Sequence, residues 1–505
     1  NSRVQNMYFG QSVSIDGNFA IVGANGSNSD TTNSNLLNKS GSVYFYKKNS
    51  NLEWEYYQKV VPNDRATNDK FGISVSIKGN FAAIGSLSPS DSNSINSLTN
   101  SGAVYIFELK SSGIWTQIKK ISAPDRASGD IFGFPVLLKN DFLMIGSQSN
   151  STDENGLNSK NSAGAIYAYN FSNNGNTYFK QKITARDRDN GDSFGSGIDY
   201  NGRELIIGAT SNWDSLAGVP VPRSGSVYVF SQDSLNIWQE TQRISIPDMK
   251  MLDYTGGSNF IFDSTLVIGT PQKDFDTIGS SIISQSGAAY IYNKTPTGKW
   301  IFSQKIIADN KIASGGFGNS AAINRDTLLI GYPGDKPDAL GQFAGSVVVY
   351  QKNNLGLWVK KSKLISSDNI ACTVGDLFGS SLAITGNDII IGVPNDGKTT
   401  YSCLDDTVNT AGSVFFTSFK FLSQKEVKKE DIKITLYPNP TSNIISIKET
   451  NIKINSIQVY NYQGQLVKNV VSGFQTIDIT EMPSGLYFLK INTPEQAINK
   501  RIIKI

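Results

Sequence analysis

Most of the chain consists of short segments in which apolar, β-branched and aromatic residues alternate with polar residues or run together. Turns rich in Gly, Asn, Asp and Ser separate these segments, as Lys78-Gly79-Asn80 does. Segments of this kind, about four to eight residues long and bounded by turn residues, are typical of β-strands. The pattern therefore predicts an all-β protein.

The strands belong to a repeat whose first landmark is a Phe-Gly pair. The Phe residues of these pairs are Phe9, Phe71, Phe132, Phe194, Phe317 and Phe378. Between the fourth and fifth pairs, Gly256-Gly257 lies at the expected place without its Phe. Internal repeats at a fixed period indicate a repeat architecture, and this spacing predicts seven units.

Each unit has three further landmarks. An apolar run ends in Gly and a small residue, as at Ile21–Ala24, and a Gly-Ser-Val-Tyr segment follows after a long loop, as at Gly41–Tyr44. An aromatic residue then precedes a strand that resembles Gln-Lys-Ile. These aromatic residues are Trp54, Trp115, Tyr178, Trp238, Trp300 and Trp358. Four strands in each of seven units predict a seven-bladed β-propeller over residues 1–421.

This repeat resembles the FG-GAP repeat, which builds the propeller of integrin α-subunits and occurs in many bacterial surface proteins. The resemblance rests on Phe-Gly followed by Gly-Ala, or by Gly-x-Pro as in Gly331-Tyr332-Pro333. It covers residues 1 to about 421. It implies a propeller fold and, in the integrin type, loops that hold calcium.

The two ends of the repeat array lack complementary strands. Aligning the first two Phe-Gly pairs places Asn1 beside Asn63, just after the strand that contains Trp54. The first unit therefore begins without the strand before it, and the seventh unit has no Trp strand after Phe416. Because an unpaired sheet edge is a liability, we expect residues upstream of Asn1 to supply the closing strand.

Composition excludes several classes of function. The chain has no histidine, which removes Ser-His-Asp triads, Cys-His dyads and histidine-based zinc sites. Charged residues make up 18% of the chain and the net charge is +3, without a basic concentration of the kind that nucleic-acid binders carry. No run of 18 apolar residues occurs, so no helix is expected to span a membrane. We therefore expect no enzyme of these classes and no nucleic-acid partner.

Two sets of loops are expected on one face of the propeller. The long loops connect the second and third strands of each unit, and the Asp loops connect the fourth strand to the next Phe-Gly pair. The Asp loops repeat an Asp-Arg pair and a further Asp, as in Asp64-Arg65 with Asp69. Such Asp residues commonly accept hydrogen bonds from turn backbone, which favours a structural role over a ring of cation sites. Binding residues more often lie in long loops on a rigid scaffold.

The loop sequences indicate whether the propeller contains a calcium-binding pattern. No long loop has the full Asp-x-Asp-x-Asp-Gly spacing that surrounds one ion with oxygens. The candidate ligands are Asp153 and Asn155 in a long loop and Asp187, Asp189 and Asp192 in an Asp loop. Either group can be an ordinary turn, which is the more common reason for such Asp residues.

Cys372 and Cys403 are the two cysteines of the chain. They lie in the Asp loop and the long loop of the seventh unit, on either side of Phe378-Gly379, hence on the same face. We expect a disulfide between them in an oxidising compartment, provided their Cα atoms lie within about 7 Å.

Composition changes after the propeller. Residues 422–433 are charged and lack strand patterning, which predicts a linker. Residues 434–505 then show shorter strands without Phe-Gly pairs. The predicted strands are Ile444–Ile447, Ser456–Tyr460, Gln465–Val467, Thr476–Ile479, Gly485–Ile491 and Lys500–Ile505. This predicts a small immunoglobulin-like β-sandwich.

The second domain resembles the type A C-terminal sorting domain of the type IX secretion system of Bacteroidetes. The resemblance rests on Leu436–Pro440, Val459–Gly464, Met482–Tyr487 and Lys500–Ile505, in this order. It implies that the sorting signal includes Tyr437, Pro438, Asn439, Pro440, Gly464, Gly485, Tyr487, Lys500 and Lys504. It also implies passage through the periplasm and outer membrane of a Gram-negative bacterium, with the translocon and an outer-membrane shuttle protein as partners.

The resulting hypothesis is a non-catalytic protein of the cell surface or the extracellular space. Its propeller would bind a glycan or another protein through the loop face, as in adhesion. Two alternatives stay open: a secreted hydrolase that acts on polysaccharide, and a structural component of a surface adhesion apparatus. The many loop Asp residues allow any carboxylate pair to be selected, so no catalytic pair is predicted.

Overall fold

The computed structural model describes residues 7–88, 98–276, 282–337, 344–366, 375–396, 411–418, 435–448, 454–461, 465–492 and 497–505. The chain divides into two compact units, Asn1–Phe419 and Lys420–Ile505. All regular elements in the described ranges are strands. Within these ranges no helix is long and apolar enough to cross a membrane. The predicted linker, residues 422–433, lies outside the described residues.

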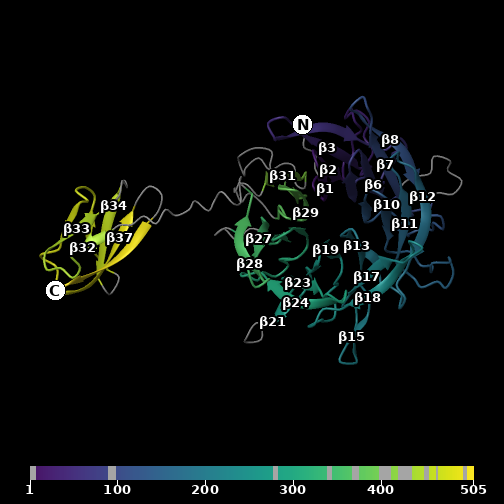
Figure 1. The fold of residues 1–505 in the computed structure, drawn as a ribbon. Coiled ribbons are helices and arrows are strands. Elements are labelled where there is room, and N and C mark those ends of the chain that lie inside the picture. Colours follow the sequence, from purple (N-terminus) through teal and green to yellow (C-terminus); the bar gives the residue numbers. More distant parts are fainter. Residues whose placement is uncertain are drawn as a thin grey trace. The chain divides into compact units, whose positions relative to one another are not determined.

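Seven antiparallel sheets of three or four strands lie among the described residues of the first unit and are numbered here as blades 1 to 7 (Figure 1). Blades 1 to 3 consist of β1 (Ser12–Asp16), β2 (Phe19–Ala24), β3 (Ser42–Lys48), β4 (Trp54–Val60), β5 (Val75–Lys78), β6 (Phe81–Ser86), β7 (Ala103–Leu109), β8 (Trp115–Ile121), β9 (Val136–Leu138), β10 (Phe142–Ser147), β11 (Ala165–Phe171) and β12 (Thr177–Ile183). Blades 4 to 7 consist of β13 (Phe194–Tyr200), β14 (Glu204–Ala209), β17 (Ser226–Gln232), β18 (Trp238–Ile244), β19 (Ser258–Phe262), β20 (Thr265–Thr270), β23 (Ala288–Lys294), β24 (Trp300–Ile307), β25 (Ala321–Asn324), β26 (Thr327–Tyr332), β27 (Ser346–Lys352), β28 (Trp358–Leu364), β29 (Ser381–Thr385), β30 (Asp388–Val393) and β31 (Ser413–Ser418).

Two short hairpins extend the long loops of blades 4 and 5. They are β15 (Asp214–Leu216) with β16 (Val219–Val221), and β21 (Phe275–Asp276) with β22 (Ile282–Ile283).

The blades follow one another around a ring that returns to its start. The Gly that precedes each third strand forms a parallel bridge with the Phe position of the next unit, as Gly41 does with Phe71. Phe9 forms the same bridge with Gly412, which joins blade 7 to blade 1. In Figure 1, β1 to β3 accordingly lie next to β29 and β31. The Phe-Gly repeat thus builds a β-propeller, as the sequence predicts.

Two glycines of the repeat are required because neighbouring backbones approach closely. A Cβ on Gly23, in the Gly-Ala landmark, would lie 2.1 Å from the carbonyl oxygen of Gly72 in the next unit. Gly41 has φ +83°, and its Cβ would lie 2.1 Å from the carbonyl oxygen of Phe71. Glycine alone combines positive φ with such an approach at little cost. The landmarks therefore recur because they form the contacts between blades.

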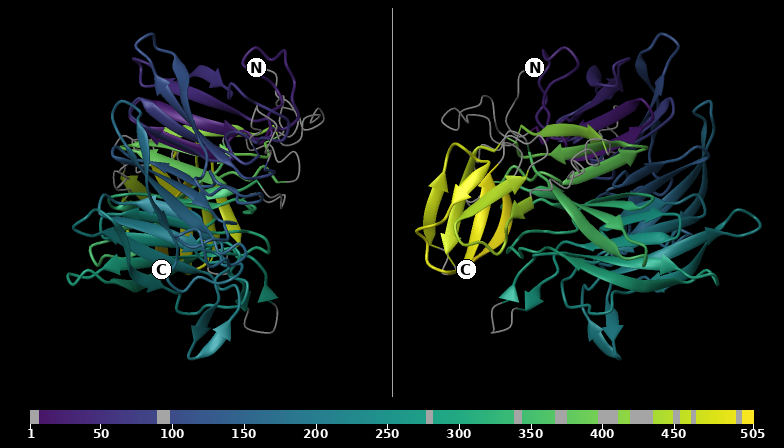
Figure 2. Two further views of the ribbon diagram at one scale, coloured as in Figure 1. Left: turned by 90° about the vertical axis from the view of Figure 1, so that its right-hand side faces the viewer. Right: turned by 60° about the vertical axis from the view of Figure 1, so that its left-hand side comes forward.

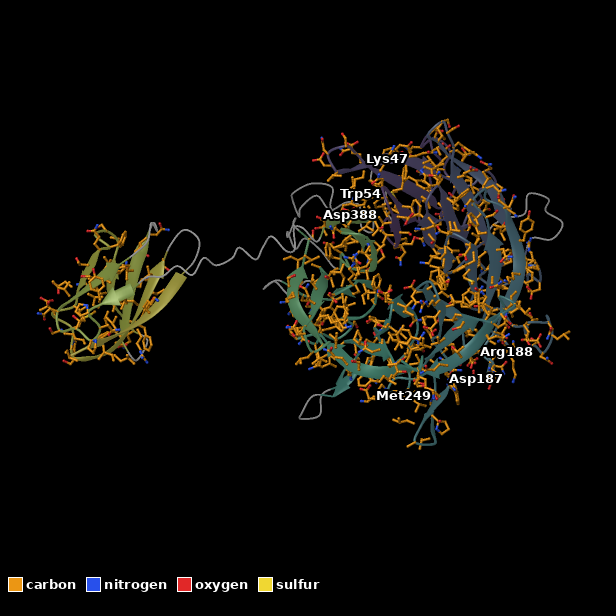
Figure 3. All side chains as sticks on the ribbon, in the orientation of Figure 1. Lys47, Trp54, Asp187, Arg188, Met249 and Asp388 are labelled. Atoms are coloured by element: carbon orange, nitrogen blue, oxygen red, sulfur yellow. The ribbon has the colours of Figure 1, made fainter. Side chains whose placement is uncertain are left out.

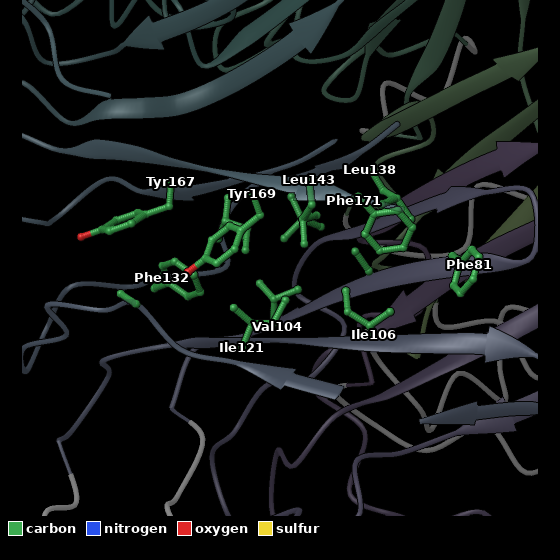
Figure 4. Close-up of a cluster of buried hydrophobic side chains, with 14 of the residues drawn as sticks. Phe81, Val104, Ile106, Ile121, Phe132, Leu138, Leu143, Tyr167, Tyr169 and Phe171 are labelled. Atoms are coloured by element: carbon green, nitrogen blue, oxygen red, sulfur yellow. The ribbon is translucent and has the colours of Figure 1, made fainter. Parts of the chain in front are cut away.

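The core consists of layers between adjacent blades. The second strands β6, β10, β14 and β20 are buried along their whole length, because a neighbouring blade covers each face. This explains why they are continuous apolar runs in the sequence. Figure 4 shows the layer between blades 2 and 3, where Val104 and Ile106 of β7 pack with Leu138 and Leu143 of blade 3.

A glutamine on the fourth strand bonds to the tryptophan of the next blade. Gln58 Nε2 donates to the carbonyl oxygen of Trp115 (2.9 Å), and the Trp115 backbone N–H donates to Gln58 Oε1 (2.8 Å). We call this reciprocal pair the Gln–Trp contact. It recurs at Gln181 with Trp238, Gln242 with Trp300 and Gln304 with Trp358.

The placement of Tyr178 at the tryptophan position is wrong by one residue. Thr177 pairs with Phe171 as Trp115 pairs with Leu109, so Thr177 occupies this position and is buried. Tyr178 is on the opposite face of the strand and is 65% exposed. The aromatic pattern favoured Tyr178, but strand alternation places it in solvent.

Neighbouring substitutions compensate for the missing tryptophan of blade 3. Phe171 is buried and its ring lies edge-on to that of Phe81, with centroids 5.2 Å apart (Figure 4). Lys119, at the position of Gln58, donates its Nζ to the carbonyl oxygen of Thr177 (2.9 Å). The same junction is thus built with different side chains.

The second unit consists of two small sheets. One has the order β32 (Thr435–Tyr437), β33 (Ile444–Lys448), β36 (Thr476–Asp478), and the other β35 (Leu466–Val470), β34 (Ser456–Asn461), β37 (Gly485–Asn492), β38 (Ala497–Lys504) (Figure 2). Ile445, Ile457, Leu489 and Ile502 are fully buried in their shared core. This agrees with the predicted small β-sandwich. The sequence analysis missed β32, which precedes the Pro-Asn-Pro segment.

Candidate functional site

The Asp loops have a structural role that recurs from blade to blade. The first Asp of the loop pairs with the basic residue on the fourth strand of the next blade. The pairs are Asp64 with Lys120, Asp125 with Lys182, Asp187 with Arg243 and Asp248 with Lys305. A Tyr of the third strand donates its hydroxyl to the same carboxylate in three of them, from Tyr167, Tyr228 and Tyr290.

The surroundings of Asp125 show how this arrangement is balanced. Burial alone would raise the pKa of Asp125, but hydrogen bonds from Lys182 and Tyr167 outweigh it and hold the pKa below its ordinary value. The same burial and the bond to Asp125 raise the pKa of Tyr167 above its ordinary value. The Asp is thus a charged acceptor between two blades, with its partners in place.

The second Asp of each loop closes its own turn. Asp192 accepts the backbone N–H of Asp189 through Oδ2 (2.6 Å), as Asp69, Asp130 and Asp253 accept the corresponding N–H groups. Asp192 is 1% exposed, and this burial raises its pKa to about 6.

The calcium candidates lie in two separate loops and have protein partners. Asp153 Oδ1 accepts the backbone N–H groups of Asn155 and Leu157, and the latter bond holds the pKa of Asp153 below its ordinary value. Asp189 pairs with Lys160. The described residues contain no group of three or more acidic or cysteine side chains suited to a metal ion. The assignment of Asp153, Asn155, Asp187, Asp189 and Asp192 as calcium ligands therefore stays a prediction.

A polar pocket of about 490 Å³ lies between blades 3 and 4 on the loop side. Asp153, Glu154, Arg186, Arg188 and Glu240 contribute charges of both signs to its lining. Several of these groups bond within the protein: Glu154 accepts the hydroxyl of Thr184, and Arg188 donates to the carbonyl oxygens of Asn158 and Ser151. Figure 3 shows Asp187 and Arg188 beside this region. The pocket is suited to a polar ligand.

A second feature of the loop side is apolar. The hairpin β15–β16 and the adjoining Asp loop expose Trp213, Leu216, Val219, Met251 and Leu252, which we call the hairpin patch. The backbone N–H of Leu252 donates to the carbonyl oxygen of Pro222, which fixes the two segments together. Trp213 is 59% exposed, although tryptophan is seldom left in water without function. Sequence analysis missed this patch, whose signal was a Trp outside the repeat positions.

Three of the predicted sorting-signal residues form hydrogen bonds within the second unit. Asn439 donates its Nδ2 to the carbonyl oxygen of Arg501 and accepts the backbone N–H of Ile503, so its amide pairs with the last strand. Lys504 is buried and donates to the carbonyl oxygens of Ile479 and Thr480, both at 2.6 Å. The hydroxyl of Tyr487 donates to the carbonyl oxygen of Pro483.

The remaining signal residues are placed differently. Tyr437, Pro438 and Pro440 are exposed, and Lys500 is half-buried on β38. Gly485 faces Lys504 across the β37–β38 pair. Gly464, Cys372 and Cys403 lie outside the described residues, so the predicted disulfide stays a prediction.

One face of the larger sheet in this unit is exposed and partly apolar. The register aligns Leu466, Tyr460, Phe488 and Arg501 across four strands, with Leu486 opposite Ile503 beside them. Leu466, Phe488 and Ile503 are each at least 40% exposed. We call this set the sheet face. It is available for a partner that has an apolar surface.

Comparisons with known proteins agree with this division. The FG-GAP repeat family matches residues 3–46, 54–107, 115–169 and 178–230. The secretion system C-terminal sorting domain matches residues 435–505. No curated protein sequence matches the chain.

Two solved structures were also found. A periplasmic gluconolactonase from Pseudomonas aeruginosa shares 9% identity at a TM-score of 0.44, with 70% of this chain and 85% of that one covered. A protein from Lactobacillus plantarum shares 10% identity at the same TM-score, covering 70% of this chain and 84% of that one.

The sorting domain indicates export through the type IX system to the cell surface or the extracellular space. The chain therefore contains four matches to the FG-GAP repeat family within its β-propeller and a secretion system C-terminal sorting domain at residues 435–505.

Proposed function

We propose that the exported propeller is a non-catalytic binding protein whose ligand is another protein, held at the hairpin patch. The observation that carries this proposal is the exposure of Trp213, Leu216 and Val219 on a hairpin that departs from the repeat. Several exposed apolar side chains on one hairpin are typical of an interaction site. A tryptophan and aliphatic side chains on the same hairpin suit an apolar protein surface better than a hydroxyl-covered glycan.

The chemistry of the loops supports binding over catalysis. The recurring carboxylates accept bonds from Lys, Arg, Tyr or turn backbone, as Asp125 and Asp192 do. A catalytic carboxylate needs access to its substrate, whereas these carboxylates are engaged between blades. Their recurrence in successive units follows from the fold, because a single active site does not need every copy.

Delivery depends on the second unit. We propose that the sheet face contacts the translocon or the shuttle protein, because the signal residues Asn439, Tyr487 and Lys504 are engaged within the domain. Phe488 and Arg501 are exposed on that face and offer an apolar and a cationic contact.

The ligand proposal is tested by screening the purified propeller against extracellular proteins and a glycan array. Replacing Trp213, Leu216 and Val219 together by Ser should weaken protein binding at least tenfold. Leu355→Ser is the matched control, because Leu355 is 84% exposed at a turn elsewhere. Saturable binding to a glycan alone, or turnover of a polysaccharide, would overturn the proposal in favour of the corresponding alternative.

Export is tested in the secreting bacterium. Deleting residues 434–505 should leave the propeller in the periplasm. Phe488→Ser with Arg501→Ala should reduce surface delivery, whereas Val471→Ser, at a residue 68% exposed outside the sheet face, should not. Normal delivery of a folded double variant would exclude the sheet face as the contact.

A further inference from the structure

The third and fourth strands of blades 1 to 6 are joined by hairpins at the end of the blade opposite the long loops. Each hairpin has a five-residue turn, closed in blade 1 by a bond from the backbone N–H of Asn49 to the carbonyl oxygen of Glu53. The fourth strands that follow, such as β8, β12 and β24, lie on the outside of the ring (Figure 1). We call each turn with the first four residues of its fourth strand a rim hairpin. The rim hairpins are residues 49–57, 110–118, 172–180, 233–241, 295–303 and 353–361.

Every rim hairpin exposes apolar side chains to solvent. One example from each blade, in order, is Leu52, Ile114, Phe179, Leu235, Phe302 and Leu355, each at least 44% exposed. More than half of the exposed large apolar side chains in the described part of the first unit lie in these six segments. Single exposed apolar residues are normal on a protein surface. Recurrence at one end of six blades instead indicates a surface that another component covers.

The turn itself does not require these side chains. Leu52 has φ +65°, and its position is occupied by glycine in four other blades, at Gly113, Gly175, Gly298 and Gly356. A residue with a Cβ is strained in this left-handed conformation, which glycine adopts freely. Because the Leu52 side chain is 67% exposed, packing within the protein does not offset the strain. A contact outside the chain explains a strained and exposed leucine better.

The fourth strands are also the outer edges of their sheets. An exposed apolar edge strand invites pairing with other chains, and natural proteins commonly place charged residues there. In blade 3 the edge begins instead, after one buried residue, with Tyr178 and Phe179, and in blade 5 with Ile301 and Phe302. A medium that covers these side chains without pairing with the backbone would remove the liability.

The distribution of the side chains favours a flat apolar medium over a protein partner. Protein interfaces depend mainly on compact groups of Trp, Tyr and Arg side chains. The rim hairpins contain no Arg, and the side chains that they expose are mainly Leu, Ile and Phe, spread over six blades. A planar layer can contact the same end of all six blades at once.

Charges of both signs flank the apolar side chains. Glu53 and Asp233 are exposed, and so are Lys299 and Lys361. Zwitterionic phospholipid head groups carry a phosphate and an ammonium group, which complement lysine and carboxylate side chains respectively. Insertion of the apolar side chains below the head groups then supplies the attraction, as it does for proteins that lie on a membrane surface.

We propose that the rim hairpins bind the surface of a phospholipid bilayer. Leu52, Leu235 and Leu355 insert among the head groups, and the flanking charges contact phosphate and ammonium. The hairpin end of the propeller lies on the membrane, so the loop side with the hairpin patch faces away from it and stays open to other proteins. Export to the cell surface or the extracellular space brings the propeller to such surfaces.

Vesicle sedimentation tests this proposal with the purified protein and phosphatidylcholine vesicles. Replacing Leu52, Leu235 and Leu355 together by Ser should weaken vesicle binding at least tenfold. The matched control is the triple Ser variant of the hairpin patch, which removes apolar side chains from the other end of the blades and should bind vesicles as the wild type does. Absence of binding by the wild-type protein, or an equal loss in both triple variants, would overturn the proposal.

A single variant separates membrane binding from folding. Leu52→Gly relieves the strain of the positive φ, so it should unfold at a higher urea concentration than the wild type while binding vesicles at least twofold more weakly. A purely structural role for Leu52 predicts lower stability and unchanged binding, and that result would contradict the insertion of Leu52.

Hydrogen exchange distinguishes the membrane from other occupants of the rim. With vesicles present, the turn amides of the rim hairpins in several blades should exchange at least threefold more slowly, whereas those of the long loops should not change. Protection confined to one blade would assign the rim to a protein partner. A dimer in light scattering that the triple Leu variant abolishes would assign it to a second copy. Either result would overturn the proposal.

Discussion

The junction between blades 4 and 5 and the junction between blades 7 and 1 differ in their outer layer of side chains. Near the ring centre both have the same bridge, at Gly225 with Thr255 and at Phe9 with Gly412. At the outside, Gln242 bonds to Trp300, which is 3% exposed, whereas Trp54 lacks that partner among the described residues and is half-buried. Backbone contacts therefore close the ring, and the outer side chains determine how completely each junction is buried.

Replacing Trp300 and replacing Trp54 should give the largest difference in the free energy of unfolding. Trp300→Ala should cost about 3–5 kcal/mol of unfolding free energy, the range for a large buried aromatic, because it leaves a cavity between two blades. Trp54→Ala should cost about 1–2 kcal/mol because its side chain is only half-buried. Urea denaturation gives both values. Equal costs would mean that other residues bury Trp54 at the junction of blades 7 and 1.

The two buried basic residues should differ in how much they contribute to stability. Lys182 is paired with Asp125, so Lys182→Met should cost about 2–3 kcal/mol by leaving a half-buried carboxylate without its cation. Lys59 is at the same position in blade 1 but is held by Ser29, the Asp30 carbonyl and Asn33, without a carboxylate partner in the described residues. Lys59→Met should change the stability by less than about 1 kcal/mol at pH 7.

The contribution of Lys59 to stability should also depend on pH. Burial lowers its pKa to about 8 in the folded protein. Between about pH 8 and 10.5 the unfolded chain therefore binds more protons at this residue, and stability rises with pH. The stability of wild type relative to Lys59→Met should increase across this window and be lowest below pH 8. A constant difference would show that Lys59 titrates normally.

The Gln–Trp contact should contribute a smaller amount. Gln242→Ala should cost about 1–2 kcal/mol, because Trp300 loses a partner for both its N–H and its carbonyl oxygen. Ser362→Ala, at the same position on β28, should cost close to nothing, because its side chain has no such bond to blade 7 among the described residues. A similar loss in both variants would contradict the role assigned to the contact.

The ion pairs at the two junctions should be nearly equal. Lys294 with Glu204 and Lys48 with Asp388 occupy equivalent positions at 2.7 and 2.6 Å, partly exposed in both cases. Double-mutant cycles should give about 0.5–1 kcal/mol for each. A much stronger coupling for Lys48 with Asp388 would mean that this pair carries the ring closure.

Sequence predicted the architecture because its landmarks are the contacts themselves. Gly23 recurs because a neighbouring backbone approaches it, and Phe71 recurs because its side chain is fully buried in the core between blades 1 and 2. Such constraints act on single residues and are therefore visible in one chain.

Other features depend on pairs of residues far apart in the sequence. Tyr178 was assigned to the tryptophan position because Phe171, which fills that space from the adjacent strand, gives no signal in the repeat pattern. The role of Asn439 was equally hidden, because its partners Arg501 and Ile503 are known only once the strands are placed. The hairpin patch had a signal, Trp213, but exposure cannot be read from residue type.

The side chains at one equivalent position of the junctions differ from blade to blade, so they distinguish the correct order of the blades from other orders. Blade 1 presents Lys48 to Asp388, blade 3 presents Phe171 to Phe81, and blade 5 presents Lys294 to Glu204. Nascent chains built from similar units risk docking on the wrong neighbour or exchanging units between molecules. A misplaced blade 3 would set an aromatic ring against a carboxylate. These pairs therefore disfavour, during folding, a ring in which the blades are docked in the wrong order.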